Sequence, residues 1–330
     1  MGLTTVLSIL FLSVIDGSQG YDQHSYPFQV KPYRELVKMF DYSVDAPLDV
    51  EEHLLLDRAG VKVFDVSFRV TSDEKRTSAY LVLPSGKGPF PAVVFLHSNG
   101  GRDAFLPTAI LLARAGVVGL ALQSVWGSLP MPQAMQHDIM AVRQAFDLLA
   151  ARGDADAKRI GAVGHSYGSM MLAVVAGIDH RFKCFVIEGG TLGMTYHLRF
   201  TSHPWGASQR NAMPPETFQE MLAAIAPFDA VHYIGHATVP LLFQSARFDV
   251  GVSEQESLDF LNAASGPKEI RWYESGHEMG NDPAVVKDRV EFLSRELGFP
   301  SLVPLLLKDM GLVRGESRPT NSGASAAVSE

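Results

Sequence analysis

The segment RIGAVGHSYGSMMLAVVA, residues 159–176, decides the fold. Residues 159–163 have strand character, and residues 169–176 suit a buried helix. The motif GHSYG, residues 164–168, is a G-x-S-x-G pattern at the corner between them. Such a corner holds its serine out of the sheet, and the flanking glycines leave room for the tight turn. We interpret Ser166 as a nucleophile; the alternative is a buried serine in an ordinary strand-to-helix connection.

A serine hydroxyl is a weak nucleophile near neutral pH and needs a neighbouring base. On this type of corner the partners follow in the chain order serine, acid, histidine. Asp249 comes shortly after the buried-strand run 239–244, and His277 follows a second strand at 269–273. We therefore expect a triad in which Ser166 attacks, His277 carries the proton and Asp249 orients the imidazole.

Each partner also has a simpler interpretation. His277 could be an ordinary loop histidine, and Asp249 could cap a helix that starts near Ser253. Glu188, which ends the strand 185–187, is the alternative acid. Comparison of Asp249→Asn with Glu188→Gln distinguishes the two acids, because only loss of the true partner abolishes turnover.

A tetrahedral intermediate also needs hydrogen-bond donors aimed at its oxygen. The corner supplies the backbone N–H of Tyr167. The apolar strand 91–96 ends in the glycine-containing loop 97–101, which occupies the matching place for the second donor. We predict the N–H of Asn99 as that donor, with Ser98 as its neighbouring candidate; the alternative is a simple polar turn.

With these residues in view, the chain resembles the α/β-hydrolase superfamily, and within it the serine esterases similar to dienelactone hydrolases and acetyl xylan esterases. The resemblance covers about residues 60–297. Its carriers are the segments 91–101, 164–168, 226–234, 240–249 and 272–277. It implies hydrolysis of carboxylic esters through an acyl-enzyme, with no metal or organic cofactor.

The chain departs from that family in two places. Dienelactone hydrolases carry a cysteine nucleophile, whereas this chain has Ser166, which argues against dienelactones as the substrate. The family loop reads His-Gly, whereas here it reads His97-Ser98. The added side chain is expected either to narrow the acyl site or to shift the geometry of the oxyanion donor.

Length and patterning indicate one domain. The 330 residues are 46% hydrophobic, which is ample for a core, and strands alternate with helical patterns from about 91 to 297. Two antiparallel strands, 61–70 and 77–83, are expected to open the sheet. We predict an α/β-hydrolase fold over residues 21–313, with a mostly parallel, doubly wound, eight-stranded sheet.

The two ends differ from this body. Residues 3–15 are apolar and uncharged, and residues 18–20 offer a cleavage site, so residues 1–20 are a possible signal peptide. Secretion or a periplasmic location follows from that interpretation; a cytoplasmic protein with a packed N-terminal helix is the alternative. The apolar segment is too short to span a membrane. Residues 314–330 are expected to form a disordered tail.

A long connection is expected to shape the substrate pocket. Residues 191–236 exceed a normal link between strands, and insertions at a strand's carboxyl end form lids in such sheets. The alternative is a surface excursion whose aromatic residues only pack on the body. The pocket candidates are Ser98, Trp126, His165, His197 and Trp205.

Composition excludes several other classes of function. The net charge is −8, and no basic stripe with interleaved aromatic residues favours nucleic acid. The single cysteine, Cys184, lies in an apolar run and is expected to be buried. Gly276-His277-Glu278-Met279 lacks the second histidine of a zinc-binding helix, and no lysine follows the 164–168 motif to bind phosphate. We expect no cofactor; the oligomeric state stays open.

The resulting hypothesis is a serine carboxylic ester hydrolase that acts on small to medium acyl esters. Two alternatives stay open: a serine peptidase of the same superfamily, and a catalytically silent binding protein on the same fold. Activity toward p-nitrophenyl acetate and a dipeptide anilide separates the first two, and labelling of Ser166 by a fluorophosphonate tests the third.

Overall fold

The computed structural model describes residues 27–70, 76–97, 100–201 and 204–304. The predicted signal peptide, the tail at 314–330, and both Ser98 and Asn99 therefore lie outside the described residues. The strands of the central sheet are β1 (Glu51–Arg58), β2 (Val61–Arg69), β3 (Arg76–Pro84), β4 (Phe90–Leu96), β5 (Val118–Leu122), β6 (Ala155–His165), β7 (Phe185–Glu188), β8 (Leu241–Ala246) and β9 (Lys268–Tyr273).

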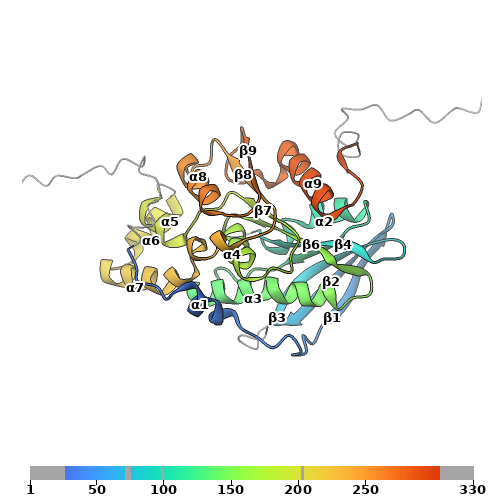
Figure 1. The fold of residues 1–330 in the computed structure, drawn as a ribbon, viewed down its shortest axis with the longest axis horizontal. Helices are drawn as coiled ribbons and strands as arrows, with labels where there is room; N and C mark the ends of the chain where they lie inside the picture. The colour runs from blue at the N-terminus through green and yellow to red at the C-terminus, as the bar shows by residue number, and fades with distance from the viewer. Residues whose placement is uncertain (1–26, 71–75, 98–99, 202–203, 305–330) are drawn as a thin grey trace, which may run out of the picture.

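The sheet has the spatial order β1-β2-β3-β5-β4-β6-β7-β8-β9 (Figure 1). The first three strands and β5 pair antiparallel, and the pairs from β5 through β4 to β9 are parallel. The mostly parallel sheet and its antiparallel start are as predicted. The number of strands is not, because the described residues form nine strands rather than eight.

The additional strand is β1, which the sequence pattern hides. All eight of its residues are exposed, so its sequence, EEHLLLDR, shows no alternation between a buried and a solvent face. A two-residue turn, Ala59-Gly60, joins it to β2, with φ angles of 53° and 77°. These positive values are typical of a type I′ hairpin turn, whose twist matches that of the paired strands.

Helices cover both faces of the sheet, as expected for a doubly wound fold (Figure 1). The side chains of α3 and α4 share one hydrophobic core, and those of α2 and α9 belong to a second core on the opposite face. The α-helices within the described residues are α1 (Tyr33–Leu36), α2 (Leu106–Ala113), α3 (Met131–Ala150), α4 (Tyr167–Ile178), α5 (Met194–Phe200), α6 (Pro204–Ala212), α7 (Pro215–Ile225), α8 (Glu254–Ala263) and α9 (Pro283–Leu297).

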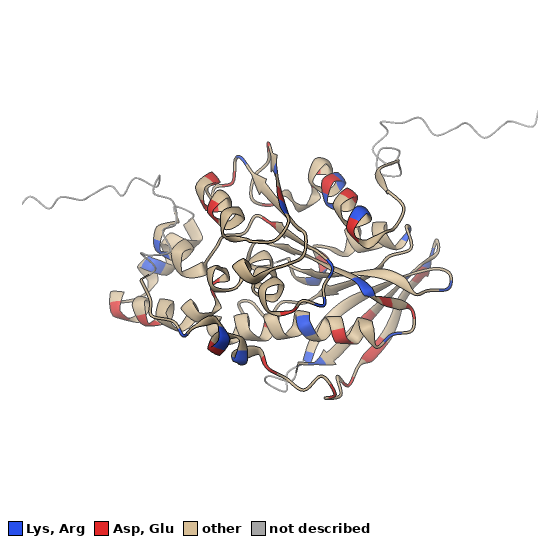
Figure 2. Cartoon of the chain, in the orientation of Figure 1, with Lys and Arg blue, Asp and Glu red and all other residues tan. Residues whose placement is uncertain are grey.

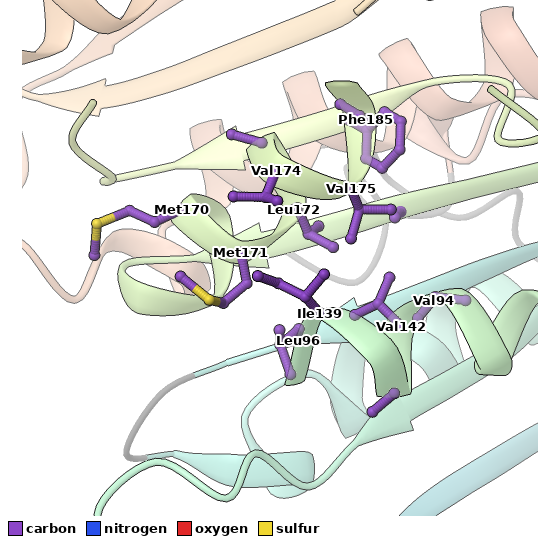
Figure 3. Packing of buried hydrophobic residues seen from close by; sticks show 14 of the residues in the cluster. Val94, Leu96, Ile139, Val142, Met170, Met171, Leu172, Val174, Val175 and Phe185 are labelled. Carbon is purple, nitrogen blue, oxygen red and sulfur yellow. The ribbon is translucent and has the colours of Figure 1, made fainter. Parts of the chain in front are cut away.

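Helix α4, which follows the G-x-S-x-G motif, is enclosed on all sides. Its residues Tyr167 to Gly177 are all buried, and it carries no charged residue. Figure 3 shows Met171, Leu172 and Val175 packed near Ile139 and Val142 of α3. Because α4 is apolar on every side, it is held by packing on both the sheet and α3 rather than by an amphipathic stripe.

Gly168 permits the close approach of α4 to the sheet. A Cβ atom at this position would lie 2.1 Å from the carbonyl oxygen of Leu96 at the end of β4. No side chain fits that distance, so the second glycine of the motif is required by packing. The contact fixes the start of α4 against the end of β4.

The segment between β7 and β8 is helical. It contains α5, α6 and α7, followed by the short 3₁₀ turns Ala226–Phe228, Ala230–His232 and Ile234–His236; residues 202–203 are not described. Figure 1 places α5, α6 and α7 together beside the carboxyl end of β7. The part of the chain that the structure describes also contains the 3₁₀ turns Val37–Phe40, Gly101–Asp103 and Met279–Asn281.

Charged residues of both signs are interspersed over the outer helices and the first strands (Figure 2). Cys184 is buried in the described structure, as predicted. Among the described helices, none combines the length and the apolar character that a membrane span requires.

Candidate active site

The nucleophile candidate occupies a strained corner. Strand β6 ends at His165, α4 begins at Tyr167, and Ser166 between them has φ 54° and ψ −122°. Positive φ is rare for a residue with a side chain and costs of order 1–3 kcal/mol, so the surroundings must hold it in place. One restraint is the N–H of Ser166, which donates to the carbonyl oxygen of Glu188 at 2.8 Å.

Three side chains distant in sequence meet at this corner. The Ser166 hydroxyl lies 2.9 Å from Nε2 of His277, and Nδ1 of His277 lies 2.8 Å from Oδ2 of Asp249. Asp249 follows β8 by three residues, and His277 follows β9 by four. The geometry therefore brings together all three residues of the predicted triad, with a hydroxyl that can donate to Nε2 and an Nδ1–H that can donate to the carboxylate.

Backbone hydrogen bonds hold the two partner loops side by side. The N–H of Arg247 donates to the carbonyl of Tyr273, at the end of β9, at 2.8 Å, and the N–H of Phe248 donates to the carbonyl of Ser275 at 3.0 Å. Asp249 Oδ1 accepts the N–H groups of residues 251 and 252 at 2.7 and 2.9 Å. The carboxylate thus has one oxygen bound to its own loop and the other directed at the histidine.

The electrostatics of the pair suit a general base. Burial alone would lower the pKa of His277, but its hydrogen bond and charge interaction with Asp249 outweigh burial and raise the pKa above 6.5. For Asp249, burial would raise the pKa, and the hydrogen bond to His277 with the backbone donors lowers it instead. The acid consequently stays ionised and favours a proton on the imidazole.

The alternative acid, Glu188, has a different role. Its side chain is fully buried and pairs with Arg289 of α9, Nη1 to Oε1, at 2.5 Å. Arg289 also donates to the carbonyl of Gly280, in the turn that follows His277, at 3.1 Å. Burial raises the pKa of Glu188 even though Arg289 opposes it. The pair therefore ties α9 and the histidine loop to β7, and Nδ1 of His277 has Asp249 rather than Glu188 as its partner.

The expected oxyanion site is described only in part. Tyr167 is the first residue of α4, where backbone N–H groups have no acceptor within the helix. The start of a helix also favours negative charge. Asn99 and Ser98 lie outside the described residues, so the second donor stays a prediction.

A pocket of about 200 Å³ opens beside the triad. Ser166 and His277 line it, together with Trp126, Tyr167, Met170, Gly189, Thr191, Met194, His197, Trp205, Gly251, Val252 and Glu278. The ring of Trp126 packs on Tyr167 at 4.3 Å between centroids and lies 5.9 Å from Trp205 of α6. One side of the pocket is therefore aromatic, with Trp126 contributed by the loop after β5 and Trp205 by α6 of the segment between β7 and β8.

The loop that carries Trp126 is anchored from below. Asp138 of α3, fully buried, accepts the hydroxyl of Ser124 at 2.5 Å and the N–H of Val125 at 3.1 Å. Trp126 N–H in turn donates to the Ser124 hydroxyl at 3.0 Å. These bonds fix the loop after β5 and, through it, the position of the indole.

Three of the five predicted pocket residues line the cavity: Trp126, His197 and Trp205. Ser98 is not described, and His165 lies beneath the site instead. His165 is 1% exposed because it is the last residue of β6 and its ring stacks on His97 at 4.6 Å. Its Nε2–H donates to the carbonyl of His277 at 2.8 Å, so it supports the histidine loop from inside.

Within the described residues, His97, His165 and Glu278 are the group whose ligand atoms lie near enough to suggest a metal, within 4.8 Å of one another. Burial lowers the pKa of each histidine to about 4, so both rings are neutral. Gly100 N–H donates to Nδ1 of His97 at 3.2 Å, which leaves the ring proton on Nε2. That tautomer favours hydrogen bonding at this position over coordination.

Sequence reasoning missed several residues around the site. Met170, Met194 and Glu278 line the pocket without forming a motif. The Glu188–Arg289 pair did leave a signal, because Arg289 interrupts the apolar stripe of α9. A charge at such a position indicates a buried partner, but it does not say which one.

The described fold and the Ser166–His277–Asp249 geometry define the class: an α/β-hydrolase with a serine-centred site. A comparison with protein families places the chain more narrowly. The prolyl oligopeptidase family model matches residues 125–299, just over half of the chain. The chain belongs to the prolyl oligopeptidase family, and the predicted superfamily is confirmed.

Individual relatives are distant. Esterase EstD from Thermotoga maritima is 22% identical over 227 residues, which cover 58% of this chain and 54% of that protein. The chain thus spans about half the length of this curated relative. An acetyl xylan esterase from Paenibacillus sp. R4 is similar in structure, with a TM-score of 0.67 and 20% identity over 80% of this chain and 92% of that chain.

A peptidase shares the fold as well. The acylaminoacyl peptidase of Pyrococcus horikoshii has a TM-score of 0.57 and 14% identity, covering 72% of this chain and 48% of that chain. At such identities the structural likeness establishes the fold alone. The choice between ester and peptide substrates therefore depends on the site.

Proposed function

We propose that this protein is a serine hydrolase that cleaves carboxylic esters with small to medium acyl groups. The observation that carries the proposal is the hydrogen-bonded chain Ser166–His277–Asp249 at the mouth of a pocket of about 200 Å³. Hydrogen-bond distances of 2.8 and 2.9 Å lie within the range that proton transfer between these groups requires.

The geometry supports a two-step reaction. His277 takes the proton of Ser166 as Oγ attacks the acyl carbonyl, and the N–H of Tyr167 donates to the oxygen that becomes negative. His277 returns the proton to the departing alcohol, which leaves an acyl-enzyme. A water molecule then attacks the acyl carbonyl while His277 takes its proton, and His277 passes that proton to Oγ of Ser166 as the bond to the acyl group breaks and the acid leaves.

The pocket supports the expected acyl size. Drug-sized ligands occupy cavities of roughly 300–1,000 Å³, and a cavity of about 150 Å³ holds benzene. The pocket volume of about 200 Å³ is close to that of the benzene-sized cavity and below the range for drug-sized ligands, which suits a small to medium acyl group. The walls combine two indole rings and two methionine side chains with Thr191, His197 and Glu278. The apolar part favours an apolar acyl group, and the carboxylate of Glu278 disfavours an anionic one.

Family membership gives the peptidase hypothesis its own support. An amide requires the same nucleophile and base, but it has a poorer leaving group, so His277 must protonate the amine as the bond breaks. The silent binding protein is the third hypothesis. Against it stands the retention of both hydrogen bonds of His277 in the described structure.

The decisive experiment compares p-nitrophenyl esters of increasing chain length with a dipeptide anilide, using Ser166→Ala as the control. We expect hydrolysis of the acetate to exceed that of longer esters and of the anilide, and no turnover by the variant. A fluorophosphonate should label Ser166 in the unaltered protein. Faster cleavage of the anilide would favour the peptidase, and failure to label would favour the binding protein.

We also propose that the protein is exported, on the sequence of residues 1–20 alone. Mass spectrometry of the exported protein should find an N-terminus at or just after residue 20. An intact Met1 in that fraction would contradict cleavage.

A further inference from the structure

Strand β1 is the open edge of the sheet, and its centre exposes three consecutive leucines between charged ends. Leu54, Leu55 and Leu56 are 55%, 56% and 44% exposed and follow one another on this strand. Figure 1 shows where β1 lies in the sheet. Edge strands carry unpaired backbone groups that can pair with another chain, and proteins ordinarily protect such strands with charge. Three exposed leucines at the centre of an edge strand instead favour contact with another apolar surface.

Strand β9 forms the other edge of the sheet, and its charged residues take part in ion pairs. Strand β9 carries Lys268, Glu269 and Arg271. Glu269 forms ion pairs with Arg271 at 2.7 Å and with Arg295 of α9 at 2.6 Å. Strand β1 also carries charged residues at both of its ends, so the two edges differ at the centre, where β1 has three consecutive exposed leucines and β9 has Ile270 and Trp272 separated by Arg271. We call this run the leucine edge, and it leaves apolar surface that a partner can cover.

The sequence of β1 is complementary to itself when it is reversed. In an antiparallel pair with a two-fold axis at Leu55, Leu54 lies opposite the partner's Leu56. His53 then lies opposite the partner's Asp57, and Glu52 opposite the partner's Arg58. Across residues 52–58, each charged residue meets the opposite charge or a histidine, and the leucines meet one another.

The charged residues of β1 are available for such a pairing. Arg58 is exposed, so its guanidinium can meet an acid from outside. Glu52 pairs with Arg152, and its side chain is still 28% exposed. Asp57 forms only a long, exposed pair with Lys62 at 3.6 Å. None of these interactions prevents the reversed pairing.

Strand β1 contains a bulge at the position of the two-fold axis. Leu54 pairs with Phe64 and Leu56 with Val63, so Leu55 is an extra residue on β1. Bulges increase twist and bend an edge strand. Because a two-fold contact uses the same surface on both chains, it closes after two copies rather than growing.

We propose that β1 mediates a symmetric homodimer in which two copies pair antiparallel about Leu55. The occupant of the leucine edge is a second copy of this chain, and the contact joins the two sheets into one. The triad lies at the ends of β6, β8 and β9, toward the other side of the sheet, so the dimer leaves both pockets open.

The test measures the mass of the full-length protein in solution by light scattering and sedimentation over a wide concentration range. The unaltered protein should be a dimer. Leu55→Lys places two like charges across the axis and should weaken dimerisation more than about tenfold in Kd. Phe200→Lys, a comparably exposed apolar position on α5, is the matched control and should remain dimeric.

A pair of charge variants tests the register itself. Arg58→Glu sets acid against Glu52, and Glu52→Arg sets base against Arg58, so each variant alone should be mainly monomeric. Mixed together, the two should form a heterodimer, because both charge pairs are restored. All variants should hydrolyse p-nitrophenyl acetate within about twofold of the unaltered protein, since a folded monomer holds a complete site.

Three results would overturn the proposal. The unaltered protein could be monomeric throughout, which would indicate that another occupant, such as residues 1–26 or a lipid surface, covers the edge. A dimer could survive Leu55→Lys, which would place the interface elsewhere. The charge variants could fail to form a heterodimer although Leu55→Lys dissociates the protein, which would refute the register.

Discussion

Ser166 is held in a strained backbone conformation. Its φ of 54° is open to glycine without cost, so Ser166→Gly should have a higher free energy of unfolding than Ser166→Ala, by about 1 kcal/mol. Both variants lose the hydroxyl, and only the alanine keeps the strain, which makes it the matched control. Chemical denaturation measures the difference. Equal stabilities would show that the corner is not strained.

The pH dependence of activity reports on His277. This residue must be neutral to accept a proton, and its pKa lies above 6.5, so kcat/KM should fall as the pH decreases through a value above 6.5. Asp249→Asn removes the partner that raises this pKa. The acidic limb should then move to lower pH, while kcat falls by roughly 10⁴-fold.

The control for that pH profile is Asp282→Asn, which changes a carboxylate that caps α9 and lies outside the pocket. The Asp282→Asn variant should show the same fall of kcat/KM at acidic pH as the unaltered protein. An unmoved limb in Asp249→Asn would show that another group sets the profile.

At the scale of single residues, the sequence predicted the three candidate catalytic residues, because they occur in a fixed order along the chain. Ser166, Asp249 and His277 each follow a strand, and parallel strands end at one edge, so their convergence could be predicted. The residues that hold these three side chains in place could not be predicted from the sequence. His165 and Glu188 act through partners more than 100 residues away, and no local pattern encodes such distances.

At the scale of elements, the approach of α4 to β4 depends on Gly168. A methyl group there would lie 2.1 Å from the Leu96 carbonyl, so Gly168→Ala should destabilise the fold by several kcal/mol, on the order of an overpacked core or more. Gly153→Ala is the control, because nothing lies within 4 Å of its added carbon. Thermal unfolding of both variants tests this, and equal midpoints would contradict it.

Element boundaries followed the sequence where burial alternates. The expected strands at 61–70 and 77–83 correspond to β2 (Val61–Arg69) and β3 (Arg76–Pro84). Strand β1 escaped prediction because both of its faces are exposed. Periodicity reports burial, so a strand that a single chain leaves uncovered gives no periodic signal.

At the scale of the molecule, the helical segment between β7 and β8 meets the rest of the domain where Trp205 of α6 approaches Trp126. Trp205→Ala removes the wall contributed by α6, so the pocket should accept longer acyl chains. The ratio of kcat/KM for p-nitrophenyl octanoate to that for the acetate should rise by about tenfold. Trp272→Ala, on β9 and outside the pocket lining, is the control. An unchanged ratio in Trp205→Ala would show that α6 does not set acyl size.

The length of segment 191–236 predicted a lid, but its contact with Trp126 could not be inferred. That contact depends on where α6 packs, and packing of connecting helices is set by the whole surface beneath them. The fold of the body, in contrast, follows from strand-and-helix alternation that each segment carries locally.

The site is assembled from segments that are made at different times. The nucleophile lies at residue 166, whereas its base arrives only with the loop after β9, at residue 277. During synthesis, therefore, the serine emerges long before anything can activate it. A growing polypeptide remains inert on the ribosome, and enzymatic competence marks the moment when the histidine loop has docked.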